Sequence, residues 1–180
     1  MIKSKRMKRV YDDGEFLYYI YTPSIFKLYY REEKGRVEPQ HRYKITHIIH
    51  MIKYIIDGGY NILYVAKNDT IVSYAIFTRC SKGLIKNSSK NDFYTIFLYT
   101  YPEYRSRGIA SKMASVMLKK INLSFNYFYK TIDKDNFSSI KVAEKSGFEK
   151  ICEANKIGLF HQIVPVANGN QFLYRFGGEK

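Results

Sequence analysis

The sequence is poor in cysteine, proline and acidic residues, and it has no tryptophan. Its 180 residues include two Cys, four Pro and 16 Asp or Glu, against 30 Lys or Arg. Cys80 and Cys152 show neither a CxxC motif nor metal-like spacing, which argues against a disulfide framework and a cysteine metal cluster. We expect both cysteines to be reduced and partly buried, as in a cytoplasmic protein.

Long apolar runs are missing as well. No stretch approaches the roughly 20 apolar residues that a membrane-spanning helix needs. The basic first residues are not followed by the apolar segment of a secretory signal. We therefore expect a cytoplasmic protein that has no membrane partner.

The shortage of acids leaves a formal net charge of +14. This balance suits an anionic ligand, but also nucleic acid or a solvated surface. The basic residues are dispersed, and no stacking motif of the Lys/Arg-Gly-Phe type occurs. The pattern therefore disfavours nucleic acid as a partner and leaves an anionic ligand or a solvated surface as the explanations.

The hydrophobic fraction of 46% and the length predict one folded domain over residues 1–180. Alternating and helical patterns predict a mixed α/β (α+β) fold without internal repeats. Predicted strands are Glu15–Tyr21, Asn61–Lys67, Ile71–Thr78, Asp92–Thr100, Phe125–Ile132, Phe148–Ala154 and Gln171–Phe176. Predicted helices are Arg42–Ile56, Ala110–Ile121 and Phe137–Lys145.

Some segments stay open or are expected to be irregular. Phe26–Tyr30 fits either a short helix or a strand, and 31–36 is expected to form a polar turn. The polar segment Ser81–Asn91 is expected to be a mobile loop. Between Asn155 and Asn170 the pattern is compatible with a strand at Leu159–Val164.

Two histidines, His47 and His50, lie three residues apart on the first predicted helix. No carboxylate accompanies them at zinc-site spacing, and Lys53 follows one turn later. A packed or solvated histidine pair explains the spacing better than a pair of ligands. We therefore expect no metal site.

The most informative stretch joins a strand to a helix through Arg105-Ser-Arg-Gly-Ile-Ala110. The aromatic and β-branched strand before it ends at Pro102, and an apolar helical face begins at Ala110. A basic, glycine-containing turn into a helix presents unpaired backbone N–H groups at the positive end of the helix dipole. The stretch therefore predicts a phosphate-binding loop.

Two motifs together carry a resemblance to a known family. Arg105-x-x-Gly108-x-Ala110 resembles the acetyl-CoA signature of the GNAT N-acetyltransferase superfamily. About thirty residues later, Asn136 to Phe148 resembles the second motif of the same superfamily, Asn-x-x-Ala/Ser followed by Gly-Phe. The resemblance covers about residues 61–154. Its Val-Ala-Glu-Lys-x-Gly-Phe segment is closest to the branch of ribosomal-protein N-terminal acetyltransferases.

The resemblance implies a mostly antiparallel central sheet with helices on both faces and a splayed V between its two middle strands, Asp92–Thr100 and Phe125–Ile132. Acetyl-CoA would lie in the V as the donor substrate. Its pyrophosphate would accept bonds from the phosphate-binding loop, and its pantetheine arm would pair with the open strand edge. The residues implied in cofactor binding are Leu98, Tyr99, Thr100, Arg105, Ser106, Arg107, Gly108, Ile109, Ala110, Asn136 and Ser139. Asn136 also fits a plain helix N-cap.

The catalytic residues stay unidentified at this stage. Many relatives place a proton-donating Tyr seven residues after the motif's Asn, and here that position is Ala143. Ser139 and Tyr99 are the candidates that remain, with Tyr127, Tyr129 or a water as further alternatives. A backbone N–H near Tyr99 or Thr100 is the natural oxyanion donor. Asp92 stands too early in its strand to act as a base, and Glu103 fits a solvated charge.

The leading hypothesis is an N-acetyltransferase that moves the acetyl group of acetyl-CoA to a primary amine of a small molecule, peptide or protein. The alternative is a non-catalytic acyl-CoA-binding or regulatory domain on the same fold, which the missing Tyr motivates. Either would act as a monomer or homodimer. A polycationic acceptor would need an acidic patch, for which Asp12, Asp13, Glu15, Glu32 and Glu33 are the available residues.

Overall fold

The computed structural model describes residues 5–30, 45–80, 84–86, 88–121, 124–158 and 161–177. These residues form nine strands, three α-helices and one short 3₁₀ helix. The strands are β1 Met7–Asp12, β2 Leu17–Tyr21, β3 Tyr60–Lys67, β4 Thr70–Arg79, β5 Phe93–Thr100, β6 Tyr127–Asp133, β7 Glu149–Ile157, β8 Gln162–Pro165 and β9 Gln171–Gly177. The helices are α1 Ile45–Ile56, η1 Pro102–Tyr104 (the 3₁₀ helix), α2 Ile109–Lys119 and α3 Phe137–Lys145.

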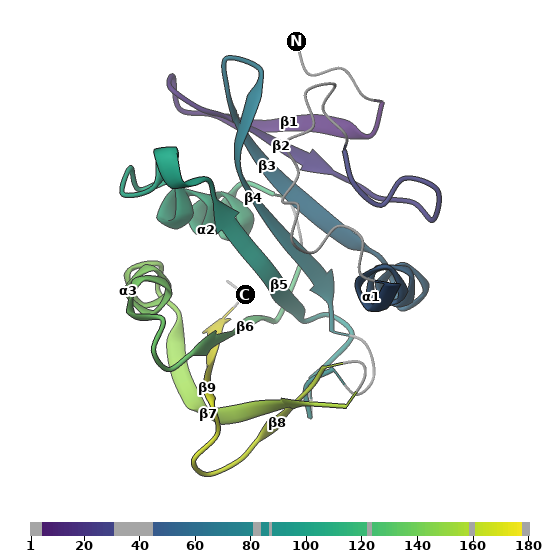
Figure 1. Cartoon of the computed structure of the whole chain (residues 1–180), viewed down its shortest axis with the longest axis vertical. Helices are drawn as coiled ribbons and strands as arrows, with labels where there is room; N and C mark the ends of the chain where they lie inside the picture. Colours follow the sequence, from purple (N-terminus) through teal and green to yellow (C-terminus); the bar gives the residue numbers. More distant parts are fainter. Residues whose placement is uncertain are drawn as a thin grey trace.

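All nine strands form one sheet in the order β1-β2-β3-β4-β5-β6-β9-β7-β8. Every neighbouring pair is antiparallel except β5 and β6, which run parallel. A parallel pair needs a crossover, and here the crossover is α2. In Figure 1, β5 and β6 diverge toward α2 and α3 respectively.

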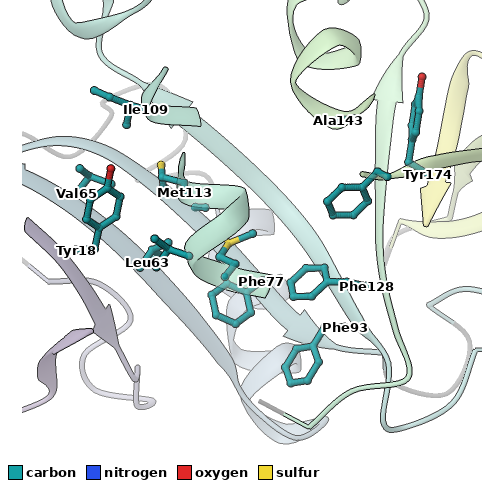
Figure 2. Close-up of a cluster of buried hydrophobic side chains, with 14 of the residues drawn as sticks. Tyr18, Leu63, Val65, Phe77, Phe93, Ile109, Met113, Phe128, Ala143 and Tyr174 are labelled. Atoms are coloured by element: carbon teal, nitrogen blue, oxygen red, sulfur yellow. The ribbon is translucent and has the colours of Figure 1, made fainter. Parts of the chain in front are cut away.

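The helices cover both faces of the sheet. On one face Met51 and Tyr54 of α1 pack against a tyrosine-rich cluster from β2, β3 and β4. On the other face α2 contributes Met113 and Met117 to a larger core, and α3 contributes Ala143 to the same core. Figure 2 shows the phenyl rings at the centre of this second core. The predicted fold class, a mostly antiparallel mixed sheet with helices on both faces, is confirmed.

The predicted central hairpin forms as expected. β3 and β4 pair along their whole length, and the turn between them is Asn68-Asp69. These two residues have φ values of 48° and 64°. Successive positive φ angles are those of a type I′ turn, which Asn and Asp tolerate better than other non-glycine residues.

Three predictions need correction. β1 was not predicted, because its outward charges, Lys8, Arg9 and Asp12, hide the alternation of an edge strand. Phe26–Tyr30 forms neither a helix nor a strand; only an isolated bridge joins Ser24 to Lys27. The expected loop Ser81–Asn91 contains Leu84 and Ile85, whose side chains are buried in a third apolar cluster. The expected turn at 31–36 lies outside the described residues.

Among the residues that the structure describes, no helix is long and apolar enough to cross a membrane.

The turn before β9 depends on the absence of one side chain. A Cβ atom added to Gly169 would lie 2.6 Å from the carbonyl oxygen of Ala154 and 2.7 Å from its nitrogen. Both atoms belong to the backbone of β7, so they cannot rotate away. The missing side chain at residue 169 therefore lets the β8–β9 turn pack on the sheet.

We predict that Gly169→Ala lowers the free energy of unfolding by about 2 kcal/mol or more, because the new methyl group displaces a paired strand. Urea denaturation followed by circular dichroism measures the change. Gly177→Ala is the matched control, since a Cβ there meets no atom within 4 Å. Equal stability of the two variants would contradict the close approach.

Candidate functional site

β5 and β6 are paired over three residues only. Phe93, Tyr94 and Thr95 pair with Phe128, Tyr129 and Lys130, and the pairing then stops. We call the point where the strands part, Thr95 and Lys130, the fork. One residue beyond it, the register between β4 and β5 shifts, which leaves Ile96 as a bulge. A bulge bends its strand and increases the twist, so β5 turns away from β6 here.

The closed end of the fork is fixed by a carboxylate and by rings. Asp92 is 2% exposed and accepts bonds from the backbone N–H of Ser89 at 2.7 Å and of Tyr127 at 3.2 Å. The rings of Phe93 and Phe128 stack with centroids 5.7 Å apart. Asp92, next to the first residue of β5, therefore joins the starts of the two strands. Because its oxygens already accept two backbone bonds, it is unsuited to act as a base.

Beyond the fork, β5 has one unpaired edge. Tyr101 donates its backbone N–H to the carbonyl oxygen of Val72 on the β4 side at 3.0 Å. Because such bonds alternate along an antiparallel pair, Tyr99 also turns its amide toward β4. Leu98 and Thr100 turn theirs toward the open edge. Of the two N–H groups expected as oxyanion donors, that of Tyr99 thus faces β4, whereas that of Thr100 faces the open edge together with that of Leu98.

A buried serine fixes the end of this edge. Ser73 Oγ donates to the Tyr99 carbonyl oxygen at 2.6 Å and lies 2.9 Å from the Thr100 hydroxyl oxygen. The Ser73 hydroxyl also lies 3.0 Å from the sulfur of Met113 in α2. Ser73 therefore positions the strand end relative to the helix.

The predicted phosphate-binding loop follows directly. Ser106 has φ 62° and Gly108 has φ 74°, and Gly108 is the N-cap of α2. The first helical bond of the turn runs from the N–H of Lys112 to the Gly108 carbonyl oxygen. Within the described residues, the backbone N–H groups from Ser106 to Ser111 have no hydrogen-bond acceptor. A Cβ at Gly108 would meet no atom within 4 Å, so the loop is open above this residue.

Two arginines line the loop, and both are exposed. Arg105 Nε donates to the Thr100 carbonyl oxygen at 3.0 Å, and its guanidinium lies 5.6 Å from the centre of the Tyr99 ring. Arg107 Nη1 lies 3.8 Å from Glu15, which also pairs with Lys67 at 2.7 Å. Arg105 thus joins the loop to the strand end, and Arg107 is partly neutralised by an acid from the β1–β2 turn.

The second motif begins α3 as predicted. Asn136 is the N-cap, and its Oδ1 accepts from the N–H of Ser139 at 3.1 Å and from the Ser138 hydroxyl at 3.0 Å. Gly147 ends the helix with φ 84°, and the N–H of Phe148 donates to the carbonyl oxygen of Ala143 at 3.1 Å. The N-cap role of Asn136 is therefore established.

The structure does not bring the two catalytic candidates together. Tyr99 packs with Phe97 and Tyr101 on the face that α1 covers. Ser139 belongs to α3, on the opposite face. Tyr129 also packs on the side away from α3. Ala143, at the position of the usual proton donor, is completely buried.

Residues that the sequence analysis did not single out lie at the fork. Thr95 and Lys130 are register partners, and the buried Thr95 Oγ1 has no hydrogen-bond partner among the described residues. A signal was present in β6: Lys130 lies on the same face of the strand as Phe128 and Ile132, which both belong to the core. A lysine in an apolar phase of a strand departs from the pattern of a solvated residue.

The histidine pair gives no metal site in the part of the chain that the structure describes, where no group of three His, Cys, Asp or Glu side chains gathers. The side chain of His47 lies outside the described residues. His50 contacts the ring of His161, with centroids 4.7 Å apart. Burial, His50 and Lys156 lower the pKa of His161.

Comparison with known proteins assigns the family. The model of the acetyltransferase (GNAT) family matches residues 22–148. This chain belongs to that family. The match includes the loop Arg105–Ala110 and the α3 motif up to Phe148, so both predicted motifs lie inside it. No protein of curated function matches the sequence.

Solved structures show the same fold at low identity. The microcin C7 self-immunity acetyltransferase MccE, in complex with acetyl-CoA and AMP, has a TM-score of 0.58 at 14% identity, covering 92% of this chain and 93% of that chain. yncA from Salmonella typhimurium, a putative acetyltransferase with its cofactor acetyl-CoA, has a TM-score of 0.53 at 16% identity, covering 74% of this chain and 75% of that chain. An acetyltransferase from Thermus thermophilus has a TM-score of 0.53 at 10% identity, covering 73% of this chain and 72% of that chain.

We predict that Asn136→Ala lowers the free energy of unfolding by about 1 kcal/mol, because the N–H of Ser139 loses its acceptor. Asn136→Asp keeps an acceptor at the same place and should retain the stability of the natural sequence. Chemical denaturation of the three proteins measures the differences. A loss as large for Asp as for Ala would show that the Asn136 side chain stabilises α3 by something other than its oxygen.

Proposed function

We propose that this protein transfers the acetyl group of acetyl-CoA to a primary amine. The observation that carries the proposal is two sets of backbone N–H groups without an acceptor among the described residues, one on the open edge of β5 and one at the start of α2. Together these sets match a ligand that is peptide-like at one end and carries phosphates at the other. The acetyl-CoA in the yncA and MccE structures supports this assignment.

The residues present fit acetyl-CoA. The amides from Ser106 to Ala110, including that of Ile109, would hold the pyrophosphate, with Arg105 and Arg107 supplying positive charge. The open backbone of Leu98 and Thr100 would pair with the pantetheine arm. The Nδ2 of Asn136 would be available to the same arm, because the helix cap uses only Oδ1. Ser139 would lie next to it, in the first turn of α3.

The chemistry needs a neutral amine, a donor for the developing oxyanion and a proton for the leaving thiolate. The N–H of Leu98, which the alternation turns toward the open edge, is the oxyanion donor that we assign. The backbone supplies this group with no side-chain motion, which favours a preorganised site. The acceptor nitrogen would approach from the face of β5 that α1 covers, where Tyr99 lies.

This approach face limits the acceptor. Phe97, Tyr99 and Tyr101 form a row of rings along it. The acids that could attract a polycation are already engaged: Asp12 pairs with Arg9, and Asp13 accepts from the hydroxyl of Tyr18. Glu32 and Glu33 lie outside the described residues. We propose an acceptor with an apolar or aromatic group beside its amine, and the ribosomal-protein branch supplies peptide N-termini as one class to test.

We further propose that residues 1–180 act as one domain in the cytoplasm, as a monomer or homodimer. The free state of Cys80 and Cys152 supports a reducing compartment. Burial raises the pKa of the Cys80 thiol to about 12, so this cysteine stays a neutral core side chain.

The alternative function is acyl-CoA binding without transfer. The burial of Ala143 favours it, since no proton donor stands at the position where the family motif supplies one. Release of free thiol from acetyl-CoA in the presence of any amine excludes this alternative. Binding of acetyl-CoA without thiol release across a broad panel of amines would establish it.

We predict that Gly108→Val weakens acetyl-CoA binding at least tenfold, because a branched side chain fills the open loop and disfavours its positive φ. Isothermal titration with acetyl-CoA measures the affinity. Gly158→Val is the matched control: its φ of 68° is close to the 74° of Gly108, and a Cβ there also meets no atom within 4 Å. Equal affinity of the two variants would refute the loop as the pyrophosphate site.

We also predict that phenethylamine and peptides with an apolar second residue are acetylated faster than spermidine or an aminoglycoside. The rings beside the open edge would bind the apolar group, and the net charge of +14 would repel polycations. Free-thiol release at equal amine concentrations measures the preference. Faster turnover of spermidine would overturn this view of the acceptor.

A further inference from the structure

Two polar side chains at the fork have no hydrogen-bond partner among the described residues. Thr95 is 8% exposed, and its hydroxyl oxygen is buried without such a partner. Lys130, its register partner, forms neither an ion pair nor a hydrogen bond with any residue that the structure describes. A buried polar group without a partner, such as the Thr95 hydroxyl, is destabilising, so its presence calls for an explanation. Lys130 beside it is partly buried.

Lys130 faces the side of the sheet that carries α2 and α3. It shares this face of β6 with Phe128 and Ile132, whose side chains belong to the core under these helices. Its Nζ lies 4.1 Å from the centre of the Phe148 ring. The ammonium therefore lies against the Phe148 ring, and the Lys130 side chain is partly buried.

No carboxylate of the described residues neutralises this charge. On β9, Tyr174 is the register partner of Lys130, and burial and Glu144 raise the pKa of its phenol. On α3, Glu144 accepts from that phenol at 3.4 Å. Burial alone lowers the pKa of Lys130, to about 8. At neutral pH most Lys130 side chains are protonated, yet they lose the proton far more readily than an exposed lysine does.

The surroundings of Lys130 are also those of the missing proton donor. Phe148 contacts the ammonium through its ring and donates its backbone N–H to Ala143 at 3.1 Å. Residue 143 is the position where the family motif supplies its acid, and here it carries only a methyl group. Lys130 and residue 143 thus have Phe148 as a common neighbour.

We propose that Lys130 is the general acid of the transfer, giving its proton to the sulfur of coenzyme A at the fork. The assignment rests on the proposed function. As the acceptor nitrogen bonds to the acetyl carbon, the carbon–sulfur bond breaks and the sulfur takes the proton of the Lys130 ammonium. The acceptor nitrogen releases one proton to water, and a proton from water restores Lys130. Thr95, on the same side of the fork, offers the ammonium an acceptor when its charge returns.

The test compares Lys130→Met and Lys130→Arg with the natural protein. Hydroxylamine is the probe nucleophile, because it is small and its nitrogen is neutral above pH 7. We expect Lys130→Met to lower kcat about 100-fold, in the range of general acid catalysis, with little change in the affinity for acetyl-CoA. The natural protein should lose activity as pH rises through about 8, and this loss should be absent in Lys130→Arg, whose side chain stays charged.

A second readout does not depend on activity. Lys130→Met removes a desolvated charge, so we expect its Tm at pH 7 to exceed that of the natural protein. Above pH 8 the folded protein loses the Lys130 proton while the unfolded chain keeps it. The stability of the natural protein therefore rises with pH relative to the variant, and the difference in Tm shrinks. Lys150→Met is the control, since Lys150 is exposed and lies 4.5 Å from the ring of Phe172.

The outcomes separate the two proposals. Failure of the natural protein to bind acetyl-CoA in titration calorimetry would refute the proposed function itself. Binding with normal turnover in Lys130→Met would overturn the role of Lys130 and leave the proposed function standing. Binding without any thiol release in the natural protein would refute the transfer itself and leave only the cofactor site. A lower Tm of Lys130→Met would identify Lys130 as a structural contact of Phe148. A lower kcat and a higher Tm of Lys130→Met, with both quantities unchanged in Lys150→Met, would support Lys130 as the general acid.

Discussion

The loss of pairing between β5 and β6 after Thr95 is the constraint on which the site depends. A sheet that stayed closed would use the backbone groups of Leu98 and Thr100 within its own ladder. The bulge at Ile96 bends β5 away, and the groups on its open edge stay available. The loop that follows leaves further backbone donors without an acceptor among the described residues, so edge and loop offer two neighbouring sets of donors.

Opening a sheet is destabilising, and the surrounding residues offset it at both ends. At the closed end, Asp92 holds the N–H of Tyr127, and Phe93 stacks on Phe128 (Figure 2). At the open end, Ser73 holds both Tyr99 and Thr100 and contacts α2. The strands are thus fixed on either side of the divergence, which gives the open edge a defined shape before any ligand arrives.

Much of this arrangement could be predicted from the sequence, because it rests on local patterns. Alternation predicted β3 to β6, and the glycines at 108 and 147 predicted the turns beside α2 and α3. The bulge at Ile96 could not be predicted, since it reflects the pairing of β5 with two different neighbours. The engagement of Arg107 with Glu15 was equally hidden, because it joins residues far apart in the chain.

The contrast between Asp92 and Lys130 shows what distinguishes a structural charge from a functional one. Both are charged groups near the fork: Asp92, just before β5, is buried, and Lys130, in β6, is partly buried. Asp92 has two backbone donors, so its charge is compensated and its role is to join strands. Lys130 contacts an aromatic ring and, among the described residues, has no anion beside it, so no opposite charge compensates its own. Natural proteins retain such local conflicts chiefly where function requires them. An ammonium without an anion beside it is stabilised when a negative charge forms next to it, and a departing thiolate carries such a charge.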